Sequence, residues 1–266
     1  MSGRLVVCPT PIGNLEDITL RVLSALREAD VVACEDTRRT GVLLERYGVQ
    51  ATLVPYHEHN ERERTADLVA RMQGGAVVAL VSDAGMPLVS DPGYVLVQGC
   101  VAAGLEVEVL PGPSAAIAAL VASALPSDTW RFAGFLPRKR AALVAAFGSQ
   151  ETLVAFESPK RVAASLAVLA ELDPARPVAV CRELTKLHEE VVRGDAATLA
   201  ARYAAAEPRG EVVLVVGAAT GGPDEEQLGG ALDAVERLTE AGARRRAAAQ
   251  VVSSLTGLPA NRLYRR

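Results

Sequence analysis

The sequence predicts an α/β protein of two domains with a small helical C-terminal extension. Up to residue 125, short apolar runs rich in β-branched residues alternate with longer stretches of 3.6-residue periodicity, which indicates repeated strand–helix units. Beyond that point the order becomes irregular and a hairpin-like stretch appears, which indicates an α+β domain. We therefore expect domains at 1–125 and 126–220 and a basic helical extension at 224–266.

The first domain is expected to contain a mainly parallel sheet. Its apolar runs are at 5–7, 31–34, 53–54, 77–81 and 107–110. The helical patterns between them are at 20–29, 41–47, 62–72, 94–103 and 114–124. Apolar runs of this kind, joined through helices, predict a parallel sheet covered on both faces. Open α/β sheets bind ligands at the carboxyl ends of their strands, so the loops there are the candidate functional loops.

The second domain and the tail are predicted with fewer elements. Strands are expected at 152–156, 178–181, 191–194 and 211–216, and helices near 139–148 and 160–171. Gly221-Gly-Pro223 predicts a linker. In the tail, a helix at 247–255 is followed by the break Thr256-Gly-Leu-Pro259 and then by residues that can restart a helix. This order of a helix, a short break and a second helix is typical of a helix-turn-helix-like element.

Composition argues against several kinds of protein. No apolar run reaches the roughly 18 residues of a membrane span, and the N-terminus has no signal-peptide pattern, so we expect a cytoplasmic protein without a membrane partner. The four cysteines form no C-x-x-C pair, which favours buried small hydrophobes over zinc or redox sites. His57 and His59 lack a third ligand at a suitable spacing, so no metal is expected.

Charge is distributed unevenly along the chain. From Arg237 to Arg266 there are seven arginines and one acidic residue, whereas the whole chain has a formal net charge of −4. A basic tail on an acidic body indicates a polyanion partner or, equally, a solvated helix face. Because Arg244, Arg245 and Arg246 stand at the entrance to the helix-turn-helix-like element, we favour contact with RNA.

The composition of the loops after the predicted strands indicates which kinds of ligand to expect. The loop at 9–14 lacks the G-x-G-x-x-G pattern, and its two prolines remove amide donors, so a diphosphate cofactor is not expected. The loop at 82–93 combines glycines and prolines directly after an apolar run, which allows the backbone to approach a ligand in a fixed shape. Pro111-Gly-Pro-Ser-Ala115 repeats this pattern, with Ser114 as the N-cap of a helix or a ligand contact. Alone, the loop at 82–93 or the loop at 111–115 is as readily an ordinary tight turn.

Six motifs in order resemble the tetrapyrrole-methylase-like family. They are Pro9-Thr-Pro-Ile-Gly-Asn-Leu-Glu-Asp17, Cys34-Glu-Asp-Thr-Arg38, the loop at 82–93, Pro111-Gly-Pro-Ser-Ala115, Phe156-Glu-Ser-Pro-Lys-Arg161 and Arg182-Glu-Leu-Thr-Lys186. The resemblance covers residues 4–217 and a short C-terminal helical region. It implies that family's two-domain fold, a homodimer and S-adenosyl-L-methionine as methyl donor. Within the family, the chain is similar to members that methylate the ribose 2′-oxygen of a cytidine in the decoding region of small-subunit rRNA.

Carried over by position, the resemblance implies a donor pocket between the two domains. The residues expected to bind the donor are Pro11, Ala84, Gly85, Met86, Val89, Ser114, Ala115, Phe156, Glu157, Leu184 and Val212. Most of them offer apolar or main-chain contacts, which suit an adenosine and a sulfonium. At position 86 the family usually has threonine, so a main-chain contact is implied there and a side-chain contact is not.

The implied reaction is an in-line displacement at a methyl carbon, for which alignment matters more than strong charge. A ribose hydroxyl is a weak nucleophile at neutral pH, so a general base is expected to take its proton. The candidates are Glu35, Asp36, His57, Asp91 and Glu183. Asp36 and Glu183 can equally pair with Arg38 and Arg182 and only shape the pocket.

Basic side chains in the predicted loops and at helix starts are candidates for contact with RNA phosphates. They are Arg38, Arg39, Arg138, Lys139, Arg140, Lys160, Arg161, Arg182, Lys186, Arg244, Arg245 and Arg246. Two other functions remain open. A methyltransferase acting on a corrin or other tetrapyrrole ring has no need of the basic tail, and a non-catalytic RNA-binding assembly factor has no need of the donor.

Overall fold

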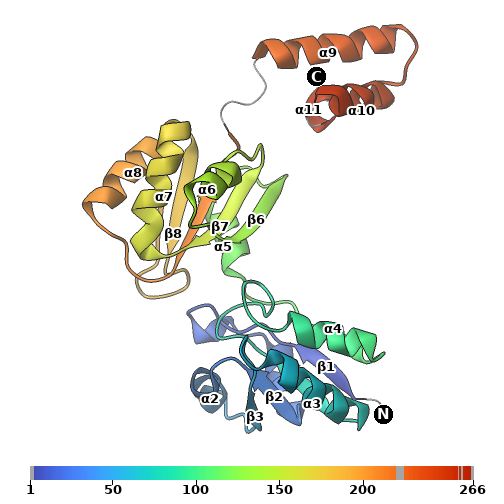
Figure 1. The fold of residues 1–266 in the computed structure, drawn as a ribbon, viewed down its shortest axis with the longest axis vertical. Helices are drawn as coiled ribbons and strands as arrows, with labels where there is room; N and C mark the ends of the chain where they lie inside the picture. Colours follow the sequence, from blue (N-terminus) through green and yellow to red (C-terminus); the bar gives the residue numbers. More distant parts are fainter. Residues whose placement is uncertain (1–2, 220–224, 257, 259, 265–266) are drawn as a thin grey trace. The chain divides into compact units, whose positions relative to one another are not determined.

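The computed structural model describes residues 3–219, 225–256, 258 and 260–264, and the chain divides into two compact units, Met1–Gly217 and Ala218–Arg266 (Figure 1). The first unit contains two five-stranded sheets. The expected linker at 221–223 and the turn residues Gly257 and Pro259 lie outside the described residues.

The first sheet is parallel throughout, with strand order β3-β2-β4-β1-β5, as the sequence predicts. Its strands are β1 (Arg4–Val7), β2 (Val31–Cys34), β3 (Leu53–Pro55), β4 (Val77–Leu80) and β5 (Glu106–Val109). The segments between them form the 3-10 helix η1 (Leu15–Asp17) and the α-helices α1 (Leu20–Glu28), α2 (Thr37–Arg46), α3 (Glu61–Gln73) and α4 (Tyr94–Ala102).

Alternate residues of the central strands face opposite layers of helices. Leu5 and Val7 of β1 pack in a cluster with side chains of α3 and α4, whereas Val6 and the following Cys8 pack with side chains of α1 and α2. Figure 1 shows α3 and α4 side by side on one face of this sheet. A strand buried on both faces needs an unbroken apolar run, which explains why this sheet can be predicted from the sequence.

The second sheet is mixed, with order β6-β7-β10-β8-β9, in which β6 and β7 are parallel and the other pairs antiparallel. Its strands are β6 (Trp130–Phe135), β7 (Thr152–Glu157), β8 (Pro177–Arg182), β9 (Glu190–Asp195) and β10 (Val212–Val216). Its helices are α6 (Arg140–Phe147), α7 (Pro159–Leu172) and α8 (Ala196–Ala205). The expected hairpin is β8–β9, whereas β6 and α8 were not predicted.

Helix α5 (Ala115–Ser123) joins the two sheets. It follows β5 of the first sheet, yet its Ala119 and Leu120 share a core cluster with Val154 and Val213 of the second sheet. The opposite face of the second sheet packs against α6, α7 and α8. The start of α5 therefore lies where loops of both sheets come together.

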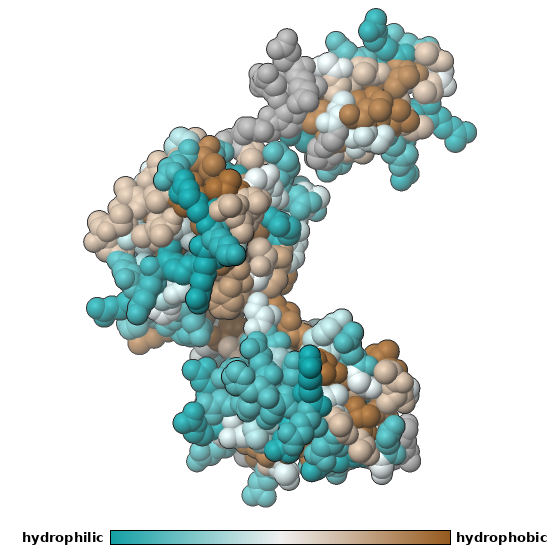
Figure 2. All heavy atoms as spheres, viewed as in Figure 1, coloured by the Kyte–Doolittle hydropathy of each residue, from teal (hydrophilic) through white to brown (hydrophobic). Residues whose placement is uncertain are grey.

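The second unit contains α9 (Glu225–Glu240), α10 (Arg245–Thr256) and α11 (Ala260–Tyr264). Apolar side chains of all three, including Val235, Ala249 and Leu263, form its core. On the face seen in Figure 2, hydrophilic side chains project around an apolar centre of this unit. In the described part of the chain, no helix has both the length and the apolar character that crossing a bilayer requires.

Candidate active site

A cavity of about 290 Å³ lies in the first unit, where loops of both sheets meet. The loop at 82–93 and the start of α5 line it from the first sheet, and the ends of β7 and β8 and the start of β10 line it from the second. The lining residues are Ile12, Ala84, Gly85, Met86, Val89, Ser90, Asp91, Ser114, Ala115, Phe135, Phe156, Glu157, Ser158, Pro159, Cys181, Leu184, Gly210, Glu211, Val212 and Val213.

Ten of the eleven residues expected to bind the donor line this cavity. The exception is Pro11, whose neighbour Ile12 lines it. Sequence reasoning missed eight further lining residues besides Ile12: Ser90, Phe135, Ser158, Pro159, Cys181, Gly210, Glu211 and Val213. Ser90, Ser158 and Pro159 stand inside motifs that the sequence had already singled out, so those motifs were a usable signal for them.

The loop at 82–93 is held in a conformation that its residues do not favour locally. Gly85 has a φ of 82° and Gly93 a φ of 136°, and the non-glycine residues Leu88 and Ser90 have φ values of 72° and 67°. Positive φ at residues with a Cβ costs roughly 1–3 kcal/mol, and such residues cluster at ligand sites. At Gly93, a Cβ would lie 2.8 Å from side-chain methyl carbons of Leu80 and Leu88, so any other residue would be strained in φ and would require these leucines to shift. The shape of the loop is therefore set by the surrounding structure and not by the local preference of its residues.

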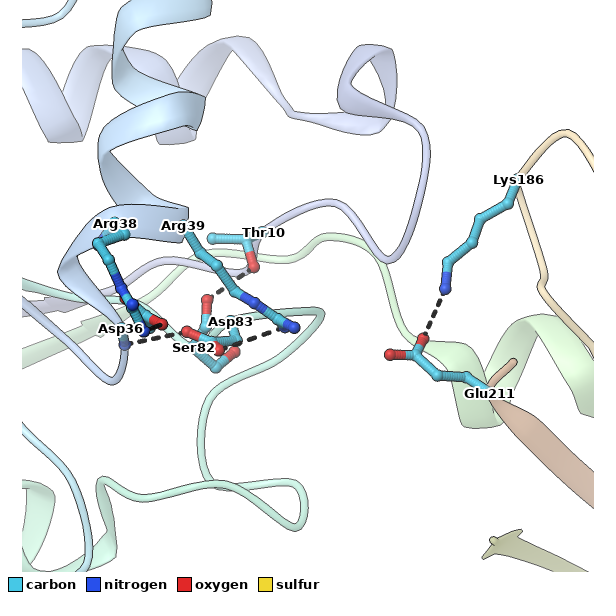
Figure 3. Close-up of polar contacts among 8 residues, drawn as sticks. All are labelled: Thr10, Asp36, Arg38, Arg39, Ser82, Asp83, Lys186 and Glu211. Carbon is cyan, nitrogen blue, oxygen red and sulfur yellow. Dashed lines mark hydrogen bonds and ion pairs between the residues drawn. The ribbon is translucent and has the colours of Figure 1, made fainter. Parts of the chain in front are cut away.

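The first loop is bonded directly to this loop. Thr10 N donates to Gly85 O at 2.9 Å, and Gly85 N donates to Thr10 O at 3.0 Å. The Thr10 hydroxyl donates to Ser82 O at 3.0 Å, as Figure 3 shows, and the Ser82 hydroxyl donates to Gly85 O at 3.1 Å. These bonds fix one side of the cavity, on which Ile12 and Gly85 lie.

A polar cluster joins the carboxyl ends of β2 and β4 beside the loop (Figure 3). Asp83 Oδ1 accepts from Asp36 N at 3.0 Å, and Asp83 Oδ2 forms an ion pair of 3.3 Å with Arg39. Asp36 is the N-cap of α2 and accepts from the Arg38 guanidinium at 2.9 Å, which lowers the pKa of Asp36 to about 2. Asp36 is therefore an ionised cap whose oxygens are occupied.

Asp91 is the catalytic candidate that lines the cavity. Burial raises the pKa of Asp91 to about 6, and the negative charges of Glu35 and Asp83 add to the effect. A carboxylate whose pKa is near 6 is a stronger base than an ordinary aspartate and is still largely ionised at neutral pH. Glu35 lies exposed at the end of β2, next to Asp36, and is not a lining residue.

His57 lies in the loop after β3, outside the cavity lining. Its main-chain N–H donates to Asn60 Oδ1 at 2.9 Å, and its ring Nε2 lies 3.3 Å from Asn60 Nδ2. The ring Nδ1 is buried and has no hydrogen-bond partner among the described residues. His57 is therefore not among the residues that line the cavity beside Asp91.

Glu183, Lys186 and Glu211 form a second polar cluster, on loops of the second sheet. Lys186 Nζ donates to Glu183 Oε1 at 2.8 Å and to Glu211 Oε2 at 3.0 Å, and Figure 3 shows the latter contact. The hydrogen bond from Lys186 lowers the pKa of Glu183, which also accepts from Glu211 N at 2.9 Å. Glu183 therefore anchors this loop as an ionised group, while Glu211 faces the cavity.

Glu157 lines the cavity, and the oxygens of its buried carboxyl group have protein partners. Its Oε2 accepts from the Ser165 hydroxyl at 2.6 Å, and its Oε1 lies 3.3 Å from Arg161 Nη1. Arg161 also donates to the carbonyl oxygens of Leu136 and Pro137 at 3.1 and 2.9 Å. The guanidinium of Arg161 is thus bound within the protein, as is that of Arg182 by Glu190 at 2.7 Å.

The other basic candidates for RNA contact differ in exposure. Arg38 and Arg39 are exposed at the first turn of α2, beside the polar cluster. Also exposed are Arg138, Lys139, Arg140, Lys160, Arg244 and Arg246. Arg140 pairs with Glu171, and Lys186 and Arg245 are partly buried. Surface cations are therefore available both beside the cavity and in the second unit.

Comparison with known proteins agrees with the six motifs. Residues 4–200 match the model of the family described as Tetrapyrrole (Corrin/Porphyrin) Methylases. A protein from Mesorhizobium japonicum named Ribosomal RNA small subunit methyltransferase I is 52% identical over 227 residues, which are 83% of this chain and 77% of that protein. A protein of the same name from Micromonospora olivasterospora is 44% identical over 268 residues, 99% of this chain and 86% of its own.

A solved structure has the same fold. The uroporphyrin-III C-methyl transferase from Thermus thermophilus, complexed with S-adenyl homocysteine, matches 81% of this chain and 97% of its own with a TM-score of 0.58. At 22% identity, this likeness concerns the fold. Together with the family match and the identities above, it confirms the predicted α/β fold class, with one parallel and one mixed sheet. The chain belongs to the tetrapyrrole methylase family and, within it, to the ribosomal RNA small subunit methyltransferase I group.

Proposed function

We propose that this protein transfers a methyl group from S-adenosyl-L-methionine to the ribose 2′-oxygen of a cytidine in the decoding region of small-subunit rRNA. The observation that carries the proposal is the preformed cavity between the two sheets, at which Asp91 stands among apolar side chains and main-chain groups. The shared name of the relatives supports RNA as the substrate. The S-adenyl homocysteine in the solved relative supports the donor.

The lining of the cavity fits the donor. Gly85 and Gly210 both have positive φ and line the cavity without a side chain, so a ligand can approach the backbone closely there. The N–H and C=O of Gly85 are already bonded to Thr10, so Gly85 offers this close approach and not a hydrogen bond. Phe156 and Val212 provide apolar surface for an adenine ring, and the negative Asp91 and the ring of Phe156 suit a sulfonium. When bound, the donor supplies an electrophilic methyl carbon, and the loop at 82–93 aligns it.

Asp91 would act as the general base. The 2′-hydroxyl of the ribose gives its proton to the Asp91 carboxylate while its oxygen forms a bond to the methyl carbon. The carbon–sulfur bond breaks, and the sulfur keeps the electron pair as a neutral thioether. Asp36 and Glu183 are less suited, because the neighbouring cations Arg38 and Lys186 lower the pKa of each carboxyl group and occupy its oxygens.

The RNA would be held by cations around the cavity and in the tail. Arg38 and Arg39 stand next to the loop at 82–93 and, because their side chains are 89% and 66% exposed, can meet phosphates. We also propose that the protein is a cytoplasmic homodimer with domains at 1–125, 126–220 and 224–266. Exposed side chains on α4, including Tyr94 and Val101 at 63% and 65% exposure, offer a surface for a contact between copies.

Labelled donor distinguishes this function from the alternatives. Purified protein is given labelled S-adenosyl-L-methionine with small ribosomal subunits, bare rRNA or uroporphyrin-III, and any labelled position is mapped. We expect label on the ribose of one cytidine, and its loss in Asp91→Asn. Label on a base or on the porphyrin would contradict the proposal. Absence of donor binding in calorimetry would favour a non-catalytic RNA-binding factor.

A further inference from the structure

The second unit has a hollow of its own, of about 390 Å³. It lies between α10 and α11 and is lined by Arg246, Ala249, Gln250, Ala260, Asn261 and Tyr264. None of these side chains is acidic or a long aliphatic one. The hollow is therefore unlike the apolar grooves that bind amphipathic helices.

The side chains around this hollow are those that bind a nucleotide. Tyr264 is 53% exposed, so its ring is accessible to a stacking partner. Gln250 and Asn261 are exposed carboxamides, which both donate and accept hydrogen bonds as base edges require. Arg246 supplies an exposed guanidinium for a phosphate. The small Ala249 and Ala260 leave room for a planar ring between the helices.

The spacing of these residues places their side chains together. Arg246 and Gln250 are four residues apart on α10, and Asn261 and Tyr264 are three apart on α11, so each pair shares one helix face. Leu263, between the two on α11, is fully buried in the core of the unit, which orients that helix. The polar faces are therefore fixed by packing beneath them.

The charge around the hollow favours a polyanion. Among the described residues, the ion pairs include none formed by Arg244, Arg245, Arg246 or Arg262. Their guanidinium groups are thus not neutralised by the acidic side chains described there. Contacts with several phosphates would follow on either side of a bound nucleotide.

We infer that this hollow binds one nucleotide of single-stranded RNA, with its base stacked on Tyr264, its polar edge against Gln250 and Asn261, and its phosphate at Arg246. The inference rests on the RNA substrate proposed above and adds a second contact that reads an unpaired base. Paired bases in a duplex are stacked and closed to such a hollow, so the ligand is single-stranded RNA.

Binding of fluorescent oligoribonucleotides to the full chain, followed by anisotropy, tests the inference. One probe is a single-stranded segment of small-subunit rRNA, and a second has the same backbone without bases. In Tyr264→Ala, affinity for the first probe should fall about tenfold and affinity for the second should not change. In Arg246→Ala, both should bind more weakly, and the dependence of log K on log salt should lose about one unit of slope.

Arg237→Ala is the matched control, because Arg237 is an exposed arginine of α9 that does not line the hollow. Arg237→Ala removes the same charge as Arg246→Ala, and the affinity of this variant for both probes should stay close to that of the unchanged protein. Equal binding by Tyr264→Ala and the unchanged protein would overturn the inference, as would equal losses with the two probes or a preference for duplex RNA.

The outcomes separate this inference from the proposed function. Donor calorimetry on Tyr264→Ala shows that the catalytic unit is intact, since Tyr264 belongs to the second unit. Tyr264-dependent binding without methylation of any RNA would leave the inference standing and sink the proposed function. Methylation by a Tyr264→Ala variant with unchanged KM and unchanged RNA affinity would do the reverse.

Discussion

Thr10 and Gly85 exchange two main-chain hydrogen bonds, of 2.9 and 3.0 Å, across two loops that end different strands of the first sheet. This pairing requires Gly85 to adopt a φ of 82°, a left-handed conformation that glycine enters without steric cost. The two loops therefore form one rigid support for whatever occupies the cavity.

Gly85→Ala should weaken donor binding by about tenfold and lower the free energy of unfolding by roughly 1–2 kcal/mol. The cause is the positive φ together with a new Cβ 3.3 Å from Ile12 Cγ2, on the cavity lining. Calorimetry with S-adenosyl-L-methionine and urea unfolding measure the two effects. Gly41→Ala is the control, because no atom lies within 4 Å of its Cβ position and α2 should gain stability. Unchanged donor affinity in Gly85→Ala would remove this loop from the donor site.

The methylation rate should rise with pH and level off above an apparent pKa of about 6, the value to which burial raises the pKa of Asp91. Asp91→Asn should lower kcat by roughly 100-fold or more and abolish that rise. In Glu35→Gln, removal of a negative charge that raises the pKa of Asp91 should move the rising limb to lower pH. Rates of RNA methylation between pH 5 and 9 at saturating donor provide the measurement. A limb that stays in place in Glu35→Gln would show that the two carboxylates do not interact.

Stability should depend on pH through the same group. Because the pKa of Asp91 is raised from 3.8 to about 6, the folded state binds more protons than the unfolded state between those values, and its stability falls as pH rises through them. Asp91→Asn removes this loss. The variant should be about 1 kcal/mol more stable than the unchanged protein at pH 8 and equally stable near pH 4. The expected gain is well below the free energy that corresponds to the full pKa shift, because Asp91 is partly solvated. Urea unfolding at both pH values measures this difference. If Asp91→Asn is less stable than the unchanged protein at pH 8, the pKa of Asp91 is not raised in the folded state.

Gly210→Ala should be more damaging than Gly104→Ala. Both glycines have positive φ, of 83° and 68°. A Cβ at Gly210 would lie 2.3 Å from Glu183 Oε1, whereas at Gly104 it meets nothing within 4 Å. Gly104→Ala should cost roughly 1 kcal/mol for conformation alone. Gly210→Ala should cost roughly 2–4 kcal/mol, because Glu183 must leave Lys186. Chemical denaturation compares them, and equal costs would mean that Glu183 moves aside freely.

Ser165→Ala should destabilise the protein by roughly 1–3 kcal/mol, because it removes the hydroxyl that donates to the buried carboxylate of Glu157 at 2.6 Å. Ser127→Ala, at an exposed position, should change stability by less than about 0.5 kcal/mol. The midpoints of urea unfolding report both. If the two variants unfold alike, water replaces the lost donor and Glu157 is not closed off from solvent.

The first sheet is predictable because its three central strands β1, β2 and β4 are apolar on both faces and alternate with helical segments. The second sheet is less so. Strand β6 contains Arg131 and Gly134, and its pairing with β7 is irregular between Phe132 and Phe135. Helix α8 follows β9 without a loop, since Asp195 both ends the strand and caps the helix. Gly194 and Asp195 mark the boundary between β9 and α8, but without a separate loop they do not indicate which of the two elements they belong to.

Helix α2 begins at Thr37, one turn before the predicted start at Gly41. The capping hydrogen bond from Arg38 N to Asp36 sets this start, while the polar first turn hides it from a search for apolar spacing. Local chemistry of this kind is present in the sequence but gives a weaker signal than an apolar stripe.

The cavity residues contributed by the loop at 82–93 can be predicted, because the glycines and prolines of this loop follow one another closely in the sequence. The opposite side is not, since Gly210 and Glu211 reach the cavity only through the pairing of β10 with β7 and β8. Phe135 depends likewise on β6 lying beside β7. Contacts created by strand order leave no local pattern, so the sequence offers no spacing from which to infer them.

Helix α5 precedes the second sheet in the chain and yet covers one of its faces. A fragment beginning at Pro126 would therefore leave Val154, Val213 and their neighbours in water, whereas one beginning at Ala115 would carry its own cover. During synthesis, α5 leaves the ribosome before any strand of the second sheet that it covers. Exchange of this half between relatives by recombination should thus succeed only when the crossover lies upstream of α5.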